Sequence, residues 1–229
     1  VRVFQACGLS FSMLIRKYFL PIARFMSNKM VTTECAVGLN VYSPQWDEMC
    51  KQVAKYGENR MVAVDYASYD TTMAAQLIIA AFRLMVDVAE VCGYTPDQLK
   101  IMSGIAYDIA NPTTAIYGNI VSLIGSNPSG HNLTVYINCI VNSLLFRMCY
   151  KLDNKGRFKD DVSLITYGDD ALCSVKPGCV FDAVIFKDFL AAFGMTVTTS
   201  DKQEITEPFE HFDDVDFLKR KRRWCSELD

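Results

Sequence analysis

The sequence lacks a hydrophobic run long enough to cross a bilayer. Its longest apolar stretch, residues 73–82, is too short to span a membrane and contains Gln76. The first residues also lack the order of charged, apolar and small residues that marks a secretory signal. We therefore expect neither a membrane-spanning nor a secreted protein. With 229 residues, of which 51% are hydrophobic, the sequence is typical of a globular, soluble protein with one substantial core or two small ones.

Metal-binding patterns of cysteine and histidine are also missing. The sequence has nine cysteines, an odd number, with no Cys-x-x-Cys spacing, and only two histidines. These counts argue against the usual zinc sites and favour reduced thiols, as in a cytosolic compartment. The formal net charge of -3 shows no general excess of the basic residues that nucleic-acid-binding domains carry. Any basic surface must therefore be local.

The sequence alternates helical and strand-like patterns along its length. It starts at Val1 and not at methionine, so we expect a piece excised from a larger protein. Apolar periodicity, the Ser43-Pro44 start signal and a capping box at Thr95 predict the other elements. The expected helices cover residues 9–26 (broken or kinked at Pro21), 44–57, 73–88, 96–109, 132–150 and 181–193, and the expected strands cover residues 1–4, 61–66, 113–123 (a hairpin turning at Gly118-Asn119), 162–166, 171–175 and 195–199.

The stretch Tyr167-Gly168-Asp169-Asp170 stands between two apolar runs that are expected to form a hairpin. Two adjacent acids at the tip of a buried hairpin repel each other, and burial disfavours both charges. A cation would relieve this repulsion, and hard divalent cations such as magnesium take oxygen ligands. From these four residues alone a plain turn is the other reading, because Gly-Asp is a common turn pair.

Two further acids stand near the end of the strand expected at residues 61–66. Asp65 lies at that strand's end, where a side chain reaches a cleft more easily than in mid-strand. Asp70 follows five residues later, just before a helical pattern. It has two readings at this point, a helix cap or a ligand-facing acid.

The loop at residues 125–130 is the most irregular of the sequence, and its glycines and proline allow unusual backbone angles and the approach of a ligand. Thr134, Asn138 and Asn142 follow at intervals of four residues, hence along one helical face. Such a polar stripe is either an internal hydrogen-bond network or a ligand-facing surface. The basic run at residues 219–223 is likewise either a solvated strand end or a phosphate-binding segment.

Taken in order, these features resemble motifs A to E of the RNA-dependent RNA polymerases of picorna-like positive-strand RNA viruses, order Picornavirales. Residues 1–6 are similar to the end of motif F, and residues 36–38 have a counterpart in the family as well. The resemblance covers nearly the whole chain. The matching residues are Asp65-x4-Asp70 for motif A, Ser129-Gly130-x3-Thr134-x3-Asn138 for B, Tyr167-Gly168-Asp169-Asp170 for C, Lys202 for D and Phe217-Leu218-Lys219-Arg220 for E.

The resemblance implies an α+β fold, namely a polymerase palm with an antiparallel sheet, flanking helices and partial fingers. Residues 1–60 would belong to the fingers and residues 61–208 to the palm, with a fingers insertion around 93–125. Residues 209–229 would form the primer-grip hairpin, and the thumb would be absent. Because most of motif F and the thumb are missing, we expect the isolated chain to be non-processive or inactive.

The resemblance also implies the chemistry of the acids. Asp65 and Asp169 would bind two Mg²⁺ ions, for which Mn²⁺ can substitute, and Asp170 would support or share this coordination. The two metals would activate a primer 3′-hydroxyl and stabilise the pyrophosphate leaving group. Lys202 stands where the family places a general acid that protonates this pyrophosphate, although a surface lysine after a strand is the alternative.

The resemblance also implies which residues select ribonucleotides; besides Asp70, they lie in the loop at residues 125–130 and in the helix expected at residues 132–150. Asp70 and Asn138 would read the ribose 2′-hydroxyl, which both donates and accepts hydrogen bonds. Ser129 and Thr134 would complete their network, and Gly130 would let the loop flex against the template nucleotide.

The basic residues would bind phosphates. Arg2 would hold the incoming triphosphate, and Lys219 and Arg220 would contact the RNA backbone near the primer end. His131 and Leu133 depart from the picornavirus form of motif B, where small residues are usual, so the subfamily stays open.

The implied function is template-directed RNA synthesis from nucleoside triphosphates in viral genome replication and transcription. Its partners would be an RNA template and primer and other viral replication proteins, in the host cytoplasm at replication complexes. Two alternatives are open. A reverse-transcriptase-like DNA polymerase would usually carry a bulky aromatic residue at the position of Asp70. A non-catalytic, palm-shaped RNA-binding module would not need Asp65, Asp169 and Lys202.

Overall fold

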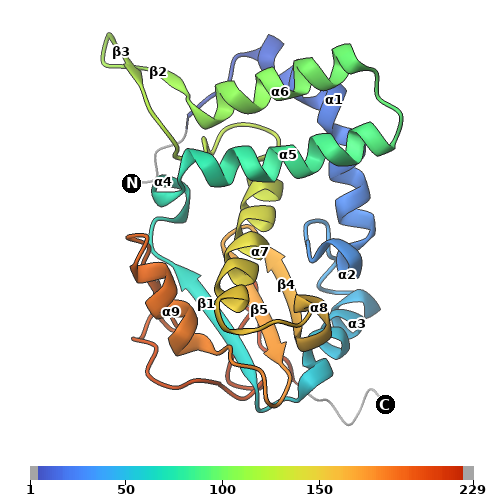
Figure 1. Cartoon of the computed structure of the whole chain (residues 1–229), viewed down its shortest axis with the longest axis vertical. Coiled ribbons are helices and arrows are strands. Elements are labelled where there is room, and N and C mark those ends of the chain that lie inside the picture. Colours follow the sequence, from blue (N-terminus) through green and yellow to red (C-terminus); the bar gives the residue numbers. More distant parts are fainter. Residues whose placement is uncertain (1–4, 224–229) are drawn as a thin grey trace.

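A four-stranded antiparallel sheet forms the centre of the lower part of the molecule in Figure 1, in the order β4-β5-β1-β6. The computed structural model describes residues 5–223, so the strand expected at residues 1–4 lies outside the described residues.

The expected α+β class is confirmed. The strands are β1 (Met61–Tyr66), β2 (Thr113–Ile116), β3 (Asn119–Ser122), β4 (Val162–Tyr167), β5 (Asp170–Val175) and β6 (Val197–Thr198); the helices are α1 (Leu9–Asn28), α2 (Met30–Thr33), α3 (Pro44–Val53), the 3₁₀ turn η1 (Ala54–Tyr56), α4 (Tyr69–Thr72), α5 (Ala75–Val91), α6 (Pro96–Ala110), α7 (Thr134–Asp153), α8 (Phe158–Asp161) and α9 (Ala183–Ala191).

The main sheet is buried on both faces. Val62 and Val64 of β1 belong to the larger core, together with side chains of α7 and α9. Met61 and Ala63, which alternate with them, belong to a second core that includes side chains of α3 and of residues 212–217. Because successive side chains of a strand point to opposite faces, a strand buried on both faces reads as one continuous apolar run. This is the pattern of residues 61–64.

A helical layer lies above the sheet in Figure 1, where α5 and α6 cross the molecule in front of α1. The capping box predicted at Thr95 starts α6, because its hydroxyl accepts from the Gln98 N–H and the Gln98 side chain accepts from the Thr95 N–H. The expected insertion at residues 93–125 consists of α6 and the β2–β3 hairpin, which lie farther from the sheet than α5 does. The proposed domain boundaries themselves stay a prediction.

Helix α1 does not break at Pro21, so of the two expected effects the break is wrong and the kink stays a prediction. The helix runs without interruption from Leu9 to Asn28. A proline inside a helix leaves the carbonyl group four residues earlier without a hydrogen-bond donor. Here that carbonyl belongs to Lys17, and both Lys17 and Pro21 are exposed, so water can replace the missing donor.

The β2–β3 hairpin turns one residue earlier than expected. Ile116 pairs with Asn119, so Tyr117 and Gly118 form the turn, with φ angles of 48° and 81°. Two positive φ angles in a two-residue loop are the type I′ geometry, which glycine and asparagine favour. The Gly118-Asn119 pair suggested the wrong register because Tyr117 is an unusual occupant of this conformation.

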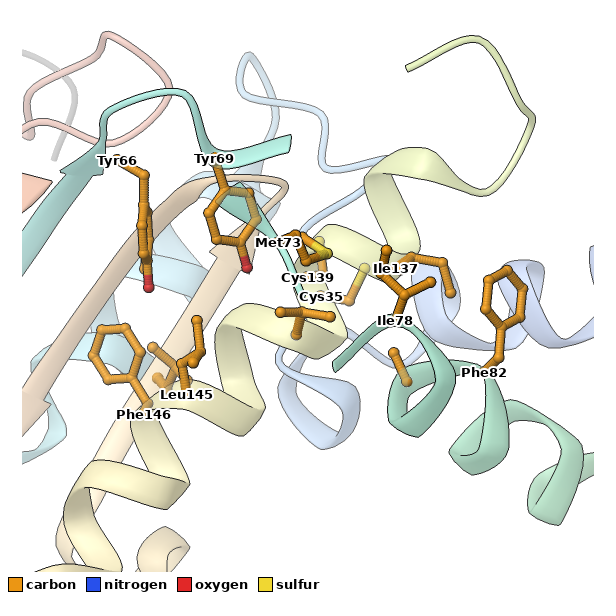
Figure 2. Close-up of a cluster of buried hydrophobic side chains, with 14 of the residues drawn as sticks. Cys35, Tyr66, Tyr69, Met73, Ile78, Phe82, Ile137, Cys139, Leu145 and Phe146 are labelled. Carbon is orange, nitrogen blue, oxygen red and sulfur yellow. The ribbon is translucent and has the colours of Figure 1, made fainter. Parts of the chain in front are cut away.

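No helix within residues 5–223 is both long and apolar enough to cross a membrane. The eight cysteines of this part of the chain are free thiols, and most of them are buried. Cys35 and Cys139 lie close together in the larger core, near Met73 (Figure 2). Both fill space in the core, and Cys139 Sγ also donates to the Thr166 carbonyl oxygen at 3.7 Å.

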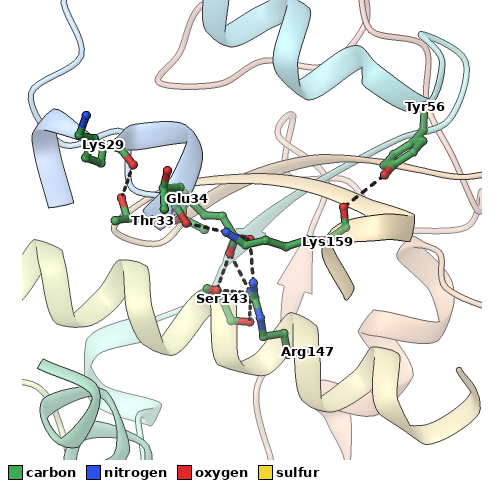
Figure 3. Close-up of polar contacts among 9 residues, drawn as sticks. Lys29, Thr33, Glu34, Tyr56, Ser143, Arg147 and Lys159 are labelled. Carbon is green, nitrogen blue, oxygen red and sulfur yellow. Dashed lines mark hydrogen bonds and ion pairs between the residues drawn. The ribbon is translucent and has the colours of Figure 1, made fainter. Parts of the chain in front are cut away.

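Glu34 forms a buried ion pair between the segment after α2 and helix α7 (Figure 3). Its two carboxylate oxygens accept from Nη1 and Nη2 of Arg147, each at 2.7 Å, and Ser143 donates to Oε2, also at 2.7 Å. The backbone carbonyl of Glu34 accepts from both the N–H and the hydroxyl of Thr166 in β4. One residue thus connects the N-terminal segment to α7 and to the sheet.

We predict that Glu34→Ala lowers the free energy of unfolding by about 2–3 kcal/mol, because the half-buried guanidinium of Arg147 loses its bidentate partner. Urea unfolding of the chain measures this change. Asp47 is the matched control, since its ion pair with Lys51 is exposed and Asp47→Ala should change stability by less than about 0.5 kcal/mol. Equal effects of the two substitutions would contradict the role assigned to Glu34.

Candidate active site

The turn at residues 167–170 joins β4 to β5, and side chains of helix α7 bind its backbone. Tyr167 pairs with Asp170, so Gly168 and Asp169 form a two-residue turn, with φ of 66° at Gly168. Asn142 of α7 donates to the carbonyl oxygens of Gly168 and Asp169 at 3.3 and 3.2 Å. Cys139 Sγ accepts from the Gly168 N–H at 3.1 Å. The turn backbone is therefore fixed, while the Asp169 side chain is exposed.

Asp65 lies in β1 next to this turn, opposite Thr198 of β6. Burial raises the pKa of Asp65, and the negative charge of Asp169 raises it further. The positive charges of Lys202 and Lys219 act in the opposite direction on the same pKa. Asp65 and Asp169 and the two lysines thus share one electrostatic environment.

Asp170 is the most strongly perturbed of the three acids. Burial, followed by the charges of Asp169, Asp65 and Asp216, raises the pKa of Asp170 to about 6, and the Leu218 N–H opposes this rise. A carboxyl group with such a pKa is only partly protonated at neutral pH, so the acids carry uncompensated negative charge. Asp216 belongs to this cluster although the sequence did not single it out.

The donor set suits a divalent cation that the substrate helps to bind. Within residues 5–223, no group of three or more His, Cys, Asp or Glu side chains is close enough to form a preformed metal cage. Magnesium is usually held by one or two carboxylates, with water and substrate phosphates completing its shell. Carboxylate oxygens alone favour Mg²⁺ or Mn²⁺ over zinc. Asp65, Asp169 and Asp170 fit this description.

Asp70 and Asn138 are in direct contact although 68 residues separate them. Nδ2 of Asn138 donates to Oδ1 of Asp70 at 2.7 Å. Burial raises the pKa of Asp70, the hydrogen bond from Asn138 lowers it, and Asp169 raises it again. Ser68 occupies the N-cap position of α4 and Asp70 lies within the helix, so the reading of Asp70 as a helix cap is wrong.

Aromatic side chains support Asp70 and Asn138 from the core. Tyr66 and Tyr69 lie side by side with ring centroids 4.4 Å apart, and Leu145 and Phe146 of α7 lie next to them in Figure 2. The Tyr69 hydroxyl donates to the Asn138 carbonyl oxygen at 3.2 Å. This packing connects the end of β1 rigidly to α7.

The polar stripe on α7 combines the two readings that the sequence left open. Asn142 is internal, since it also accepts from the Tyr66 hydroxyl at 2.9 Å. Thr134 donates to the carbonyl oxygens of Pro128 and His131 at 2.7 and 3.0 Å, so its hydroxyl closes the loop and does not join Asp70 and Asn138. Thr134 joins the network only through its backbone, because its carbonyl oxygen accepts from Asn127 Nδ2, which also donates to Asn138. Asn138 contacts Asp70 directly.

Gly130 makes a close backbone contact that leaves no room for a side chain. It pairs with Ala6 in a parallel bridge, and a Cβ atom at position 130 would lie 1.8 Å from the Gln5 carbonyl oxygen. Only glycine permits such an approach. The expectation that Gly130 lets the loop flex stays a prediction. Ser129, next to it, is exposed.

The basic residues predicted to act on phosphates differ in backbone conformation and in contacts. Lys202 and Lys219 both adopt left-handed backbone conformations in turns, with φ of 61° and 56°. Arg220 donates to the Tyr42 hydroxyl at 2.9 Å and lies over its ring, with its guanidinium carbon 4.9 Å from the ring centroid. Arg220 is therefore engaged by an exposed tyrosine. Arg2 lies outside the described residues.

Asn127 and His131 are buried polar residues that the sequence reasoning left without a role. Their exposed fractions are 2% and 6%. Burial lowers the pKa of His131 to about 4, so its ring is neutral at physiological pH. The sequence signalled His131 only as a departure from the family pattern, and nothing local connected either residue to Asp70.

We predict that His131 makes the chain less stable in acid. Between about pH 6.5 and 4 the unfolded chain binds a proton at this histidine while the folded chain does not, so stability falls as the pH falls. From pH 8 to pH 5 this loss amounts to about 2 kcal/mol. Urea unfolding of His131→Gln should show a pH dependence weaker by this amount, and His211→Gln should match the unmodified chain. Equal pH dependence of His131→Gln and the unmodified chain would contradict the prediction.

Comparison with known proteins adds independent observations. The family model described as viral RNA-dependent RNA polymerase matches residues 1–224. The chain is 28% identical to the replicase polyprotein of cricket paralysis virus over 96% of its length, and 30% identical to the RNA1 polyprotein of Andean potato mottle virus over 99%. It is 31% identical to the RNA1 polyprotein of cowpea mosaic virus over 96% of its length.

These relatives are much longer than the chain. The matched region makes up 13%, 32% and 12% of the cricket paralysis virus, Andean potato mottle virus and cowpea mosaic virus polyproteins, respectively. The similarity therefore concerns one region of each polyprotein. The family model, which matches residues 1–224, includes all of the candidate site residues.

Proposed function

The chain belongs to the family of viral RNA-dependent RNA polymerases, and from this membership we propose that it carries the active site for template-directed RNA synthesis. The reaction would join nucleoside triphosphates to an RNA 3′ end during viral genome replication and transcription. The observation that carries this proposal is the hydrogen bond between Asn138 and Asp70, formed beside the acids Asp65 and Asp169. A ribose-reading pair next to a metal-binding pair is what RNA synthesis requires.

The acids would hold the catalytic metals. In the proposal Asp65 and Asp169 are the principal ligands, and Asp170 supports them. Two Mg²⁺ ions, or Mn²⁺ in their place, would activate the 3′-hydroxyl and stabilise the departing pyrophosphate. The fixed turn backbone supports this assignment, because Asn142 and Cys139 hold the turn while its first acid side chain stays exposed. Substrate phosphates would complete the metal shells.

Lys202 would supply a proton to the leaving pyrophosphate. Its charge acts on Asp65, which supports a position near the reacting phosphates. An ammonium group in this place can donate a proton as the bond to the pyrophosphate breaks. The positive charge of Lys219 also lowers the pKa of Asp65. Lys219 and Arg220 would contact RNA phosphates, and Arg2 would bind the triphosphate.

Asp70 favours RNA synthesis over the alternative of DNA synthesis. The ribose 2′-hydroxyl can donate to a carboxylate oxygen and accept from an amide N–H, and Asp70 and Asn138 offer both groups side by side. A site built to exclude this hydroxyl would need bulk at position 70. Several acids lie close enough to Asp170 to raise its pKa, and RNA binding alone would not require such a group of like charges. This argues against a purely RNA-binding module.

The proposed partners follow from the reaction and from the relatives. RNA template and primer and nucleoside triphosphates are the substrates, and other viral replication proteins are proposed partners because the relatives are polyproteins. The proposed location is the host cytoplasm, at viral replication complexes. Because the chain spans only part of these relatives, activity is best assayed in the complete protein that carries it.

We predict that Asp169→Ala lowers primer extension by the complete protein at least about a thousandfold, because a metal at this site contributes several kcal/mol to the transition state. Exposed Asp87 of α5 is the matched control, and Asp87→Ala should leave the rate unchanged. Retained synthesis by Asp169→Ala would refute the proposed site.

We also predict that Asp70→Ala reduces the preference for ribonucleotides over 2′-deoxynucleotides by about 10- to 100-fold, because a hydrogen bond to a charged group is lost. The measurement is the ratio of kcat/KM for the two nucleotides. An unmodified protein that prefers deoxynucleotides would instead favour the DNA polymerase reading.

A further inference from the structure

A continuous chain of side-chain hydrogen bonds leads from the loop after β3 to Asp70. The Leu133 N–H donates to His131 Nδ1 at 3.2 Å, and His131 Nε2 lies 2.9 Å from Asn127 Oδ1. Asn127 Nδ2 donates to Asn138 Oδ1 at 2.7 Å, and Asn138 Nδ2 donates to Asp70 Oδ1 at 2.7 Å. The middle members His131, Asn127 and Asn138 are all buried. We call these three residues the relay.

The direction of every bond in this chain is fixed by its two ends. A backbone N–H can only donate, so Nδ1 of His131 is the unprotonated nitrogen and the neutral ring carries its proton on Nε2. Nε2 therefore donates to Asn127, whose amide must then donate to Asn138. At the other end the carboxylate of Asp70 can only accept. A flipped amide at either asparagine would place two donors or two acceptors face to face.

This polarity determines what Asn138 and Asp70 can offer to a nucleotide. Asn138 Oδ1 is occupied by Asn127, so the group that remains for a ligand is the second N–H of its amide. Asp70 keeps Oδ2 as an acceptor. A neighbouring donor and acceptor match a hydroxyl group, whereas a flipped Asn138 would present a second acceptor beside the carboxylate.

The loop does not need the relay to stay in place. Backbone bonds already attach it to the segment after β1, because the Asn127 N–H donates to the Asp70 carbonyl at 2.9 Å and the Ser126 N–H donates to the Met73 carbonyl at 2.8 Å. The Thr134 hydroxyl closes the other side of the loop. The buried side chains of Asn127 and His131 are thus available for orienting Asn138.

We propose that His131 and Asn127 are positioning residues for ribose recognition, which hold the Asn138 amide with its N–H groups toward Asp70 and the ribose 2′-hydroxyl. This inference rests on the proposed function. It assigns part of the selectivity for ribonucleotides to two residues that do not contact the nucleotide. Losing the donor at His131 leaves Asn127 Oδ1 without its partner, so only the 3.3 Å bond from Asn127 Nδ2 to the Thr134 carbonyl oxygen still opposes a flip of Asn127 and then of Asn138.

The test compares two substitutions of His131 in the complete protein. His131→Met has a similar size but no donor, and His131→Gln keeps an N–H group near the place of Nε2. We expect His131→Met to lower kcat/KM for ribonucleotides about tenfold and to leave kcat/KM for 2′-deoxynucleotides unchanged. His131→Gln should restore most of the ribonucleotide efficiency. Asn127→Leu should behave as His131→Met does.

A merely structural role predicts a different pattern, in which both nucleotides lose efficiency together. His211 is the matched control, because it is the only other histidine and is exposed, and His211→Met should change neither value. In an Asp70→Ala background, His131→Met should have no further effect on the ratio, since the carboxylate that the relay serves is gone. An additional tenfold loss there would overturn the proposal.

Nitrogen-15 NMR of the unmodified chain tests the relay without any variant that could fail to fold. The expected result is that the His131 ring is neutral at pH 7 with its proton on Nε2. A proton on Nδ1 would overturn the inference. In the kinetic assay, an unmodified protein that synthesises RNA while His131→Met keeps the full nucleotide ratio overturns the relay alone, whereas an unmodified protein that synthesises no RNA overturns the proposed function and the relay with it.

Discussion

The hydrogen bonds from α7 to the β4–β5 turn are the interaction on which the rest of the site depends. Asn142 holds the carbonyl oxygens of Gly168 and Asp169 and also accepts from Tyr66 of β1. It thereby fixes the two acid-bearing segments relative to each other. Carboxylates that repel one another stay close only where the backbone that carries them cannot move apart. Burial raises the pKa values of Asp65 and Asp170, and the neighbouring acids raise them further, as this constraint requires.

Helix α7 connects the acids proposed to bind metal to the residues proposed to read the ribose. Asn138 lies one helical turn before Asn142 and contacts Asp70, and Thr134 lies one turn earlier still and closes the loop. Because successive turns of one helix are rigidly spaced, a nucleotide placed by its ribose is also placed relative to the acids. The ion pair of Glu34 with Arg147 holds the same helix at its other end.

Local signals predicted most of the fold. The Ser43 cap and the Thr95 capping box depend only on residues that are close in sequence, and both are present in the structure. The acids could be named because each stands in a recognisable motif. By contrast, Glu34 and Arg147 are 113 residues apart, and the need for glycine at position 130 comes from the carbonyl of Gln5. The role proposed for His131 and Asn127 depends on the bonds from His131 to Asn127 and from Asn127 to Asn138, and such tertiary contacts leave no local pattern.

The central claim is that the acids of β1 and of the β4–β5 turn form a metal site that the substrate completes. Calorimetric titration with Mn²⁺, with and without a nucleoside triphosphate and annealed template-primer, tests it directly. Mn²⁺ alone should bind weakly, and it should bind at least about tenfold more tightly when the triphosphate is present, because the phosphates supply the missing ligands. Equal Mn²⁺ affinity with and without the triphosphate would contradict this claim.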